Sequence, residues 1–408
     1  MKCRFCKTPL THVFIDLINS PASNSFLTDE ELNEPEIFYP LKVFTCHKCF
    51  LVQVDEYKKS DKIFDNKYVY FSSYSTSWLQ HAKTYTQMMV ERFALTDKSK
   101  VIEIASNDGY LLQYFREQHI PVLGIEPTAN TAEVAKSKGI ESVVDFFGVR
   151  LAKELAAKNI YADVLLGNNV LAHVPDILDF VGGMKIVLKK DGVITMEFPH
   201  LMQLVDNNQF DTIYHEHFSY LSFTTVKAIF ESQGLALFDV EELSTHGGSL
   251  RIFAKHKEDA SKSVSARVNE LLLKEEKAGM LDMAYYRDFS EKAMKVKIDL
   301  LSFLADQKRV GKKVAGYGAA AKGNTLLNYC GVKRDMISFV VDANPHKQNK
   351  FLPASHIPVV NEDHLRSERP DYVIILPWNL REEITAQLNY IREWNGKFVI
   401  PIPELQVI

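Results

Sequence analysis

Two Cys-x-x-Cys pairs constrain the fold of this chain more than any other feature. Cys3 and Cys6 form the first pair, and Cys46 and Cys49 form the second. Such a turn directs two thiolates toward one centre about 2.3 Å away, so two turns complete a tetrahedral zinc site. A cytosolic redox pair and two coincidental pairs are the alternatives. We predict a structural zinc ion held by all four thiolates, with short strands in the segment between the pairs.

Charge and hydropathy limit the partners and the compartment. The 408 residues carry 48 Lys and Arg against 52 Asp and Glu, a net charge of −4, which argues against binding of nucleic-acid polymers. The sequence has no apolar run of about 18 residues, so we expect no membrane-spanning segment. Its first residues lack the apolar stretch of a signal peptide. We therefore expect a cytoplasmic protein, in which cysteines are more often ligands than disulfides.

An aromatic segment follows the second cysteine pair. Residues 68–74 include three tyrosines and two serines next to one another. This composition fits a strand with one half-buried face, and it also fits the wall of a pocket.

The segment 99–125 reads as strand, turn, helix and strand. Residues 101–105 are apolar apart from Glu103, residues 106–109 have turn chemistry, and Glu126 follows the strand at 121–125. An acidic residue about 20 positions beyond such a turn binds a ribose diol in nucleotide-binding folds. The glycine fingerprint of dinucleotide binding is absent, and Asp108 stands where a pyrophosphate needs bare amides. The turn therefore favours S-adenosylmethionine, which is cationic and has no phosphate, over NAD.

Later elements continue the alternation of strands and helices. Further strands are predicted at 143–145, 163–167 and 192–197. This pattern predicts a parallel sheet that binds its ligand at the carboxyl ends of the strands. Asn168, Asn169 and His173 follow the fourth strand and should lie near the cofactor.

A second polar cluster, Tyr214-His215-Glu216-His217, follows the fifth strand. Its glutamate and histidines could bind a metal, but their spacing puts them on no common helix face. A histidine base oriented by a neighbouring carboxylate is the chemical interpretation that we favour. A structural polar turn would give the same pattern.

The C-terminal third begins with helical spacing at 258–310, which predicts two or three bridging helices. A second strand–turn–helix unit opens at 313–325, where Gly316 and Gly318 would let amides approach an anion and Lys322 would add charge. A turn that only packs a helix on a sheet is the alternative, and NAD binding with Asp342 is another.

Four motifs in this order resemble one family. They are the cysteine pairs, Glu-Ile-Ala-Ser-Asn-Asp-Gly at 103–109, Tyr-His-Glu-His at 214–217 and His-Gly-Gly-Ser-Leu-Arg at 246–251. Over essentially the whole chain the sequence is similar to the deoxysugar C-methyltransferases, which use S-adenosylmethionine on nucleotide-linked 4-keto sugars. The family usually has Gly where Ala105 stands, and this departure affects the fine geometry of the turn.

The resemblance implies an α/β fold in several parts. We place a zinc-binding, substrate-contacting domain at 1–75 and a class I, Rossmann-like methyltransferase domain at 76–257. A helical bridge at 258–310 then leads to a second Rossmann-like domain at 311–408, which would bind the sugar nucleotide.

The resemblance also implies roles for individual residues. His217 resembles the base that deprotonates carbon 3 of a dTDP-4-keto-deoxysugar, so that the resulting enolate is methylated. Tyr214 and Glu216 resemble its supporting pair, His173 a second active-site histidine, and Tyr68 a tyrosine from the first domain. The cofactor-binding candidates are Glu103, Ala105, Asn107, Gly109, Glu126, Pro127, Asp145, Phe146, Asn168, Asn169 and His173. The substrate-binding candidates are Ser23, Asn24, Phe26, Tyr68, Tyr70, Ser72, His246, Arg251, Gly318, Lys322, Asn324, Asn344, Lys350 and Trp378.

Two other functions fit the same sequence. One is O- or N-methylation of another small metabolite, and the other is a non-catalytic nucleotide-binding scaffold. The sequence specifies neither the sugar nor its nucleotide, and it is compatible with a monomer.

Overall fold

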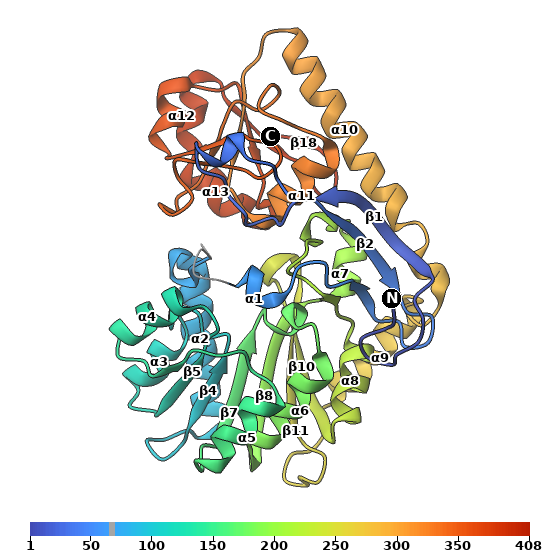
Figure 1. Cartoon of the computed structure of the whole chain (residues 1–408), viewed down its shortest axis with the longest axis vertical. Helices are drawn as coiled ribbons and strands as arrows, with labels where there is room; N and C mark the ends of the chain where they lie inside the picture. The colour runs from blue at the N-terminus through green and yellow to red at the C-terminus, as the bar shows by residue number, and fades with distance from the viewer. Residues whose placement is uncertain (65–69) are drawn as a thin grey trace.

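The computed structural model describes residues 1–64 and 70–408, which form three β-sheets (Figure 1). The first sheet has four antiparallel strands in the order β1–β2–β3–β9. They are β1 (His12–Ser20), β2 (Tyr39–Thr45), β3 (Val52–Val54) and β9 (Ser219–Tyr220). Because β9 comes from the middle of the chain, the first sheet is completed by a strand that directly follows the Tyr-His-Glu-His motif.

The second sheet has seven strands in the order β10–β11–β8–β7–β4–β5–β6. Strands β4 to β8 are parallel, whereas β11 runs antiparallel to both of its neighbours. The strands are β4 (Val101–Ile104), β5 (Val122–Ile125), β6 (Ser142–Val143), β7 (Ala162–Asn168), β8 (Leu188–Pro199), β10 (Leu235–Leu243) and β11 (Ser249–His256). The predicted parallel strands are therefore present, each within a few residues of its expected position.

Helices cover both faces of this sheet because neighbouring strand residues point to opposite sides. Val164 and Leu166 pack on the face of α2 (Thr76–Phe93), α3 (Leu112–Glu117) and α4 (Ala129–Ser137). Leu165 packs on the other face. That face carries α5 (Val149–Ala157), α6 (Ile177–Val187), α8 (Phe223–Ser232) and α9 (Ala266–Lys277).

The third sheet also has seven strands, in the order β14–β15–β13–β12–β16–β17–β18, with a parallel centre and antiparallel edges. Its strands are β12 (Val314–Tyr317), β13 (Val340–Val341), β14 (Lys350–Phe351), β15 (Pro358–Val360), β16 (Tyr372–Ile375), β17 (Lys397–Ile400) and β18 (Gln406–Val407). The accompanying helices are α11 (Ala321–Cys330), α12 (Asp363–Glu368) and α13 (Arg381–Gln387). Cys330, which stands outside the two pairs, is buried in α11.

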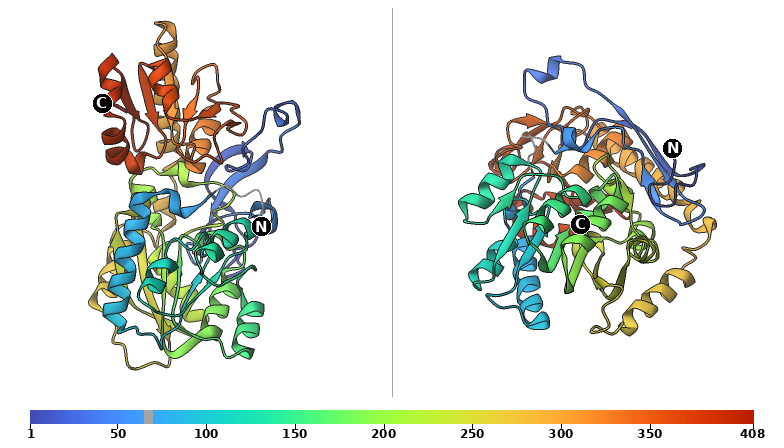
Figure 2. Two further views of the ribbon diagram at one scale, coloured as in Figure 1. Left: turned by 90° about the vertical axis from the view of Figure 1, so that its left-hand side faces the viewer. Right: turned by 60° about the horizontal axis from the view of Figure 1, so that its bottom comes forward.

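The long helix α10 (Phe289–Arg309) joins the first sheet to the third. Its Phe289 stacks on Phe14 of β1 with ring centroids 4.5 Å apart, and one continuous hydrophobic core runs from β1 and β2 through α10 into the third sheet. Figure 2 shows α10 along the C-terminal domain. Residues 258–310, predicted to be helical, thus contain α9 and α10.

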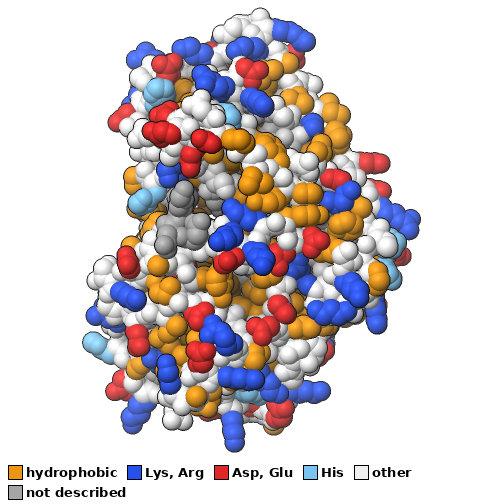
Figure 3. Space-filling view, viewed as in Figure 1, with side chains coloured by type: hydrophobic (Ala, Val, Ile, Leu, Met, Phe, Trp, Pro, Cys, Tyr) orange, Lys and Arg blue, Asp and Glu red, His pale blue; other side chains and the backbone are white. Residues whose placement is uncertain are grey.

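The carboxyl ends of β4, β5, β7 and β8 face the first sheet and the C-terminal domain (Figure 1). The short helices α1 (Ser60–Ile63) and α7 (Leu201–Asp206) lie in this central region. Figure 3, in the same view, shows Lys and Arg side chains near the middle of this face. In the described parts of the chain, no helix is both long and apolar enough to span a membrane.

Candidate active site

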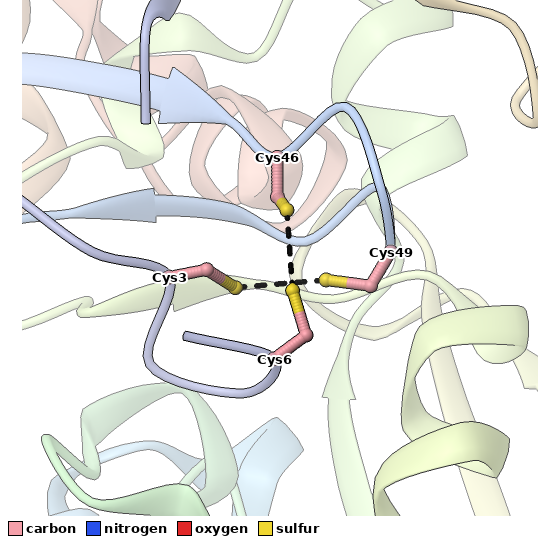
Figure 4. Close-up of side chains that lie close together, drawn as sticks. All are labelled: Cys3, Cys6, Cys46 and Cys49. Carbon is pink, nitrogen blue, oxygen red and sulfur yellow. Dashed lines mark hydrogen bonds between the residues drawn. The ribbon is translucent and has the colours of Figure 1, made fainter. Parts of the chain in front are cut away.

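The four paired cysteines meet at one point (Figure 4). Their sulfur atoms all lie within 4.8 Å of one another, and the Cys3–Cys49 and Cys6–Cys46 pairs are each 3.5 Å apart. A tetrahedral zinc ion with bonds of about 2.3 Å needs sulfur atoms roughly 3.8 Å apart. The arrangement therefore fits zinc, and four thiolates leave no open coordination position.

Each cysteine pair sits on a tight turn of the same kind. The amide of Lys7 donates to the carbonyl of Cys3 at 3.0 Å, and the amide of Phe50 donates to that of Cys46 at 2.8 Å. Lys7 and Phe50 both have positive φ angles, 61° and 58°. The second turn joins β2 to β3, so the antiparallel pairing of these strands fixes two of the four ligands.

The turn after β4 carries three residues with positive φ: Ala105 (57°), Asn107 (49°) and Gly109 (75°). Ala105 stands in the left-handed region that glycine adopts more readily, at the position where the family usually has glycine. The side chain of Asn107 accepts from the amide of Ser72 at 2.9 Å and donates to the carbonyl of Tyr70 at 3.1 Å. The predicted aromatic segment therefore crosses this turn.

Buried polar groups beside the turn fit a polar cofactor. The carboxylate of Glu103 and the side-chain amide of Asn168 are buried, and in the described chain their polar interactions are confined to the hydroxyl of Tyr110, without hydrogen bonds of ordinary geometry. Burial raises the pKa of Glu103 well above its usual range. Unsatisfied groups of this kind cost about 1–3 kcal/mol each unless a ligand pairs with them. They lie at the carboxyl ends of β4 and β7, where the sequence predicts S-adenosylmethionine.

Glu126, predicted to bind the ribose, is partly used by its own loop. One carboxylate oxygen accepts from the amide and hydroxyl of Thr128, and the other accepts from the amide of Asn107 at 2.9 Å. The second oxygen has a further lone pair for a ligand. Glu126 thus orders the turn as well as facing the predicted cofactor position.

Asp108 does not support the preference for a cationic ligand that its position in the turn suggested. Its carboxylate lies 3.5 Å from the ammonium of Lys138 and accepts from the amide of Ser73. Because its charge is compensated within the protein, Asp108 does not by itself select a cationic ligand.

The other cofactor candidates lie at the same edge of the sheet. Pro127 follows β5, while Asp145 and Phe146 follow β6. Phe146 is 40% exposed, and Asp145 forms an ion pair with Arg150 at 2.6 Å.

His217 and His173 lie side by side, with ring centroids 4.5 Å apart. The ring of Tyr214 lies 4.0 Å from that of His217. His217 Nδ1 is 2.8 Å from the carbonyl of Thr212, and a carbonyl can only accept, so Nδ1 carries the proton and Nε2 has the lone pair. A backbone carbonyl therefore orients the predicted base.

Burial holds both histidines neutral. It lowers the pKa of His173 to about 4 and that of His217 well below the ordinary 6.5. The neighbouring His173, His246 and Lys322 lower the His217 pKa further, opposed by the Thr212 carbonyl. A neutral imidazole with a free Nε2 has the protonation state of a general base.

Glu216 does not orient His217, contrary to the carboxylate–histidine pair that the spacing suggested. Its carboxylate instead accepts from the side-chain amide of Asn24, at 2.7 Å. Burial raises its pKa to about 7, opposed by Asn24 and Lys58. His215 also points elsewhere, toward the carbonyl of Pro40 at 3.2 Å.

His246 belongs to the same cluster. Its Nε2 accepts from the side-chain amide of Asn169 at 2.6 Å, which joins two predicted site residues. The ring lies 5.0 Å from that of Trp78 in α2, and burial lowers its pKa to about 4.

Arg251, a predicted substrate-binding residue, is held by two carboxylates. Its guanidinium is enclosed by the carboxylates of Glu197, at 2.5 Å, and Glu241, at 2.9 Å. It also lies 4.9 Å from the centroid of the Tyr85 ring. The side chain is 6% exposed, and these ion pairs join β11 to β8 and β10.

The C-terminal domain brings Lys322 and Trp378 to the site. The indole of Trp378 donates to Asp211 at 2.8 Å, and burial raises the pKa of Asp211 to about 6. Lys322 donates to Asn379 at 2.7 Å and lies over the Trp378 ring. Gly318 has φ 87°, and a Cβ there would meet Pro377 at 2.4 Å, so packing alone requires this glycine.

Three parts of the chain meet at this site through Asn324. Its amide donates to the carbonyl of Ser23 at 2.6 Å, and Ser23 precedes Asn24, the partner of Glu216. Thr325 donates to the carbonyl of Ile213 at 2.9 Å. The N-terminus of α11 is therefore fastened to both the first part and the Tyr-His-Glu-His loop.

The remaining substrate candidates are less closely joined. The ring of Phe26 lies 5.7 Å from the ammonium of Lys347, Asn344 is buried in the loop after β13, and Lys350 is half-buried on the edge strand β14. Tyr70 is 44% exposed, Ser72 is buried, and Tyr68 lies outside the described residues.

Sequence reasoning missed a buried set beside the cofactor position. His81 of α2 lies 2.8 Å from Glu197 at the end of β8, and its ring stacks on Trp78. Asp211 was also missed. A single polar residue in an apolar helix or strand produces no periodic pattern that would reveal it. The available signal was in β8, a buried strand with Glu197 near its end, as β4 has Glu103 near its end.

The comparisons with known proteins agree with this geometry. The chain matches a domain family named for zinc binding at residues 3–64, the Methyltransferase domain family at 78–240 and the C-methyltransferase C-terminal domain family at 244–403. The first match contains all four cysteines and confirms the structural zinc. The second, with the strand order of the middle sheet, confirms the α/β methyltransferase fold.

Individual proteins are similar over different lengths. The solved magnesium protoporphyrin IX methyltransferase from Synechocystis is 13% identical, covering 43% of this chain and 78% of its own, with a TM-score of 0.33. A methyltransferase from Clostridium acetobutylicum is 10% identical, covering 44% and 92%, with a TM-score of 0.36. The C-methyltransferase NovU of Streptomyces niveus is 35% identical over 407 residues, which are 100% of this chain and 96% of NovU. This protein is therefore an enzyme of the C-methyltransferase family to which its motifs point.

Proposed function

We propose that the enzyme methylates carbon 3 of a dTDP-4-keto-deoxysugar by way of an enolate. The observation that carries the proposal is the buried, neutral His217, whose Nδ1 donates to a backbone carbonyl and whose Nε2 has a free lone pair. A carbon next to a ketone is acidic enough for a positioned base of this kind. S-adenosylmethionine supplies a methyl group on a sulfonium, which a carbon nucleophile can accept.

The neighbours of His217 suit the charge that develops. As the proton moves from carbon 3 to Nε2, the negative charge collects on the substrate oxygen at carbon 4. A donor aimed at that oxygen stabilises the transition state. The hydroxyl of Tyr214, whose pKa is raised by burial, keeps its proton and can donate it to a hydrogen bond. His173 is a second candidate donor.

Groups from the outer domains would hold the nucleotide. Lys322, Asn344 and Lys350 are the candidates from the C-terminal domain, and Ser23 and Asn24, which bond to Asn324 and Glu216, are the candidates from the first domain. A diphosphate needs only a few such donors and one or two lysines, which is compatible with a net acidic chain. We also propose that the enzyme is cytoplasmic and monomeric.

Isotope exchange tests the chemistry. We expect enzyme and a dTDP-4-keto-6-deoxysugar in deuterated water to introduce deuterium at carbon 3, because proton removal precedes methyl transfer. A panel of dTDP-, GDP- and CDP-linked sugars with S-adenosylmethionine, followed by mass and carbon NMR, identifies the methylated atom. Methylation at oxygen or nitrogen, with no exchange at carbon, would reject the proposal in favour of the O- or N-methyltransferase alternative.

The pH profile tests the state of the base. His217 works only when neutral, and its pKa lies well below 6.5, so lowering the pH through 6.5 should leave most of the activity. We expect the acid limb of kcat to lie well below pH 6.5, because burial lowers the pKa at which this imidazole gains a proton. A half-maximal rate at pH 6.5 or above would show that burial does not control this histidine.

A further inference from the structure

The zinc turn reaches the histidine pair through one side chain, Arg4. Arg4 lies between the ligands Cys3 and Cys6, and its guanidinium Nη1 donates to the carbonyl of Pro175 at 2.6 Å. Pro175 is two residues beyond His173. The first zinc turn therefore holds the segment that carries one of the two histidines.

The same guanidinium also reaches the second histidine. Nη2 donates to the carbonyl of Val54 in β3, and the guanidinium carbon lies 5.4 Å from the centroid of the Phe218 ring. Phe218 follows His217 directly. The amide of Val54 donates to the carbonyl of Phe218 at 3.1 Å, and the amide of Phe218 donates to the carbonyl of Ala172 at 2.8 Å.

The backbone of Arg4 is fixed by the metal site. Its backbone amide donates to Gln53 Oε1 at 2.8 Å, and the side-chain nitrogen Nε2 of Gln53 donates to the sulfur of Cys3 at 3.2 Å. A turn of this kind is ordered by its metal, because binding and folding share one free energy. The planar fork of arginine holds two carbonyls from different segments with two separate nitrogens, a fixed geometry that the single nitrogen of lysine does not reproduce.

We infer that Arg4 is a positioning residue that couples zinc occupancy to the relative placement of His173 and His217. The zinc ion then does more than hold the first domain together, since it fixes the anchor of the fork that holds both histidine segments. The effect on turnover rests on the proposed function, whereas the effect on the histidines does not. A displacement of about 1 Å in a catalytic group can cost about 100-fold in rate.

The test uses the full-length, zinc-loaded enzyme with Arg4→Met, and Lys48→Met as the matched control. Lys48 occupies the second zinc turn, between Cys46 and Cys49, and its side chain is exposed. Zinc content, affinity for S-adenosylhomocysteine, kcat and KM are measured. The ring ¹³Cε1 NMR signals of the histidines, assigned with His173→Asn and His217→Asn, report the placement directly.

We expect the Arg4→Met enzyme to keep one equivalent of zinc and its affinity for S-adenosylhomocysteine. Both histidine NMR signals should shift, and kcat should fall by about 10- to 100-fold. Lys48→Met should change none of these. Chelation of zinc should shift the same signals in the wild type, and shift them by less in Arg4→Met, which has already lost the fork. If Arg4→Met loses zinc, Arg4→Gln takes its place, because this polar side chain is too short to reach both carbonyls.

Two results would overturn the inference. One is a pair of histidine signals that stays unchanged without the fork, and the other is a shift on chelation that is as large in the variant as in the wild type. Shifted signals with unchanged turnover would support the coupling and contradict the catalytic role of the histidines, which separates this inference from the proposed function.

Discussion

Replacing His217 with Asn is expected to lower turnover by about 10²- to 10⁴-fold, the range by which a positioned acid or base accelerates a reaction. The Asn amide can still donate to the carbonyl of Thr212, which His217 Nδ1 contacts at 2.8 Å, so the loop should keep its fold. S-adenosylhomocysteine binding should stay unchanged. The measurement is kcat by mass spectrometry, beside calorimetric binding of the product.

The matched control for that substitution is His215→Gln, two residues away. His215 donates to the carbonyl of Pro40, and a Gln amide can make the same bond, so we expect only a small change in kcat. Unchanged turnover in His217→Asn would remove this residue from the base role. Equal losses in both variants would show that the loop, rather than one imidazole, was disturbed.

The second large effect is expected from Cys46→Ser. The hydroxyl is a poor substitute for a thiolate ligand, so bound zinc should fall from one equivalent to a small fraction, measured by metal analysis. Zinc binding is worth about 10–16 kcal/mol in isolated zinc-finger peptides. We expect a clear drop in Tm and loss of turnover, since both zinc turns pack between the first sheet and the methyltransferase core.

Cys330→Ser provides the control for zinc. Cys330 is buried in α11, and burial raises its pKa to about 12, so it stays a thiol. This variant should keep all of its zinc. It should lose some stability, because a hydroxyl replaces a thiol in the buried core. Freshly purified wild-type enzyme with less than half an equivalent of zinc would contradict the tetrathiolate site.

Local patterns predicted the strands and their polar ends. The apolar run before Asn107 predicted β4, and the run before Asn168 and Asn169 predicted β7. Such strands are predictable because the pattern that marks them lies within a short stretch of sequence. The cysteine pairs were equally readable, since four thiolates at such spacing have few other uses. Both depend on neighbours in sequence.

Contacts between distant segments could not be predicted. Asn24 bonds to Glu216 across 192 positions, and Asn324 bonds to Ser23 across 301. The spacing in Tyr-His-Glu-His suggested that Glu216 orients His217. In the structure, His217 bonds to a backbone carbonyl instead, and Glu216 bonds to a side chain of the first domain. The ion pair of Arg251 could not be predicted for the same reason, because its partner Glu197 lies 54 positions away on a neighbouring strand.

The meeting of three parts of the chain at one site has a consequence during synthesis. The ribosome completes the methyltransferase sheet well before α11, yet Asn324 and Thr325 of α11 fasten the loops beside the histidines. A nascent or prematurely terminated chain can therefore fold its cofactor-binding sheet without completing the pocket around a sugar. Such long-range contacts form late. Truncated products should therefore be inactive, rather than methyltransferases without substrate selectivity.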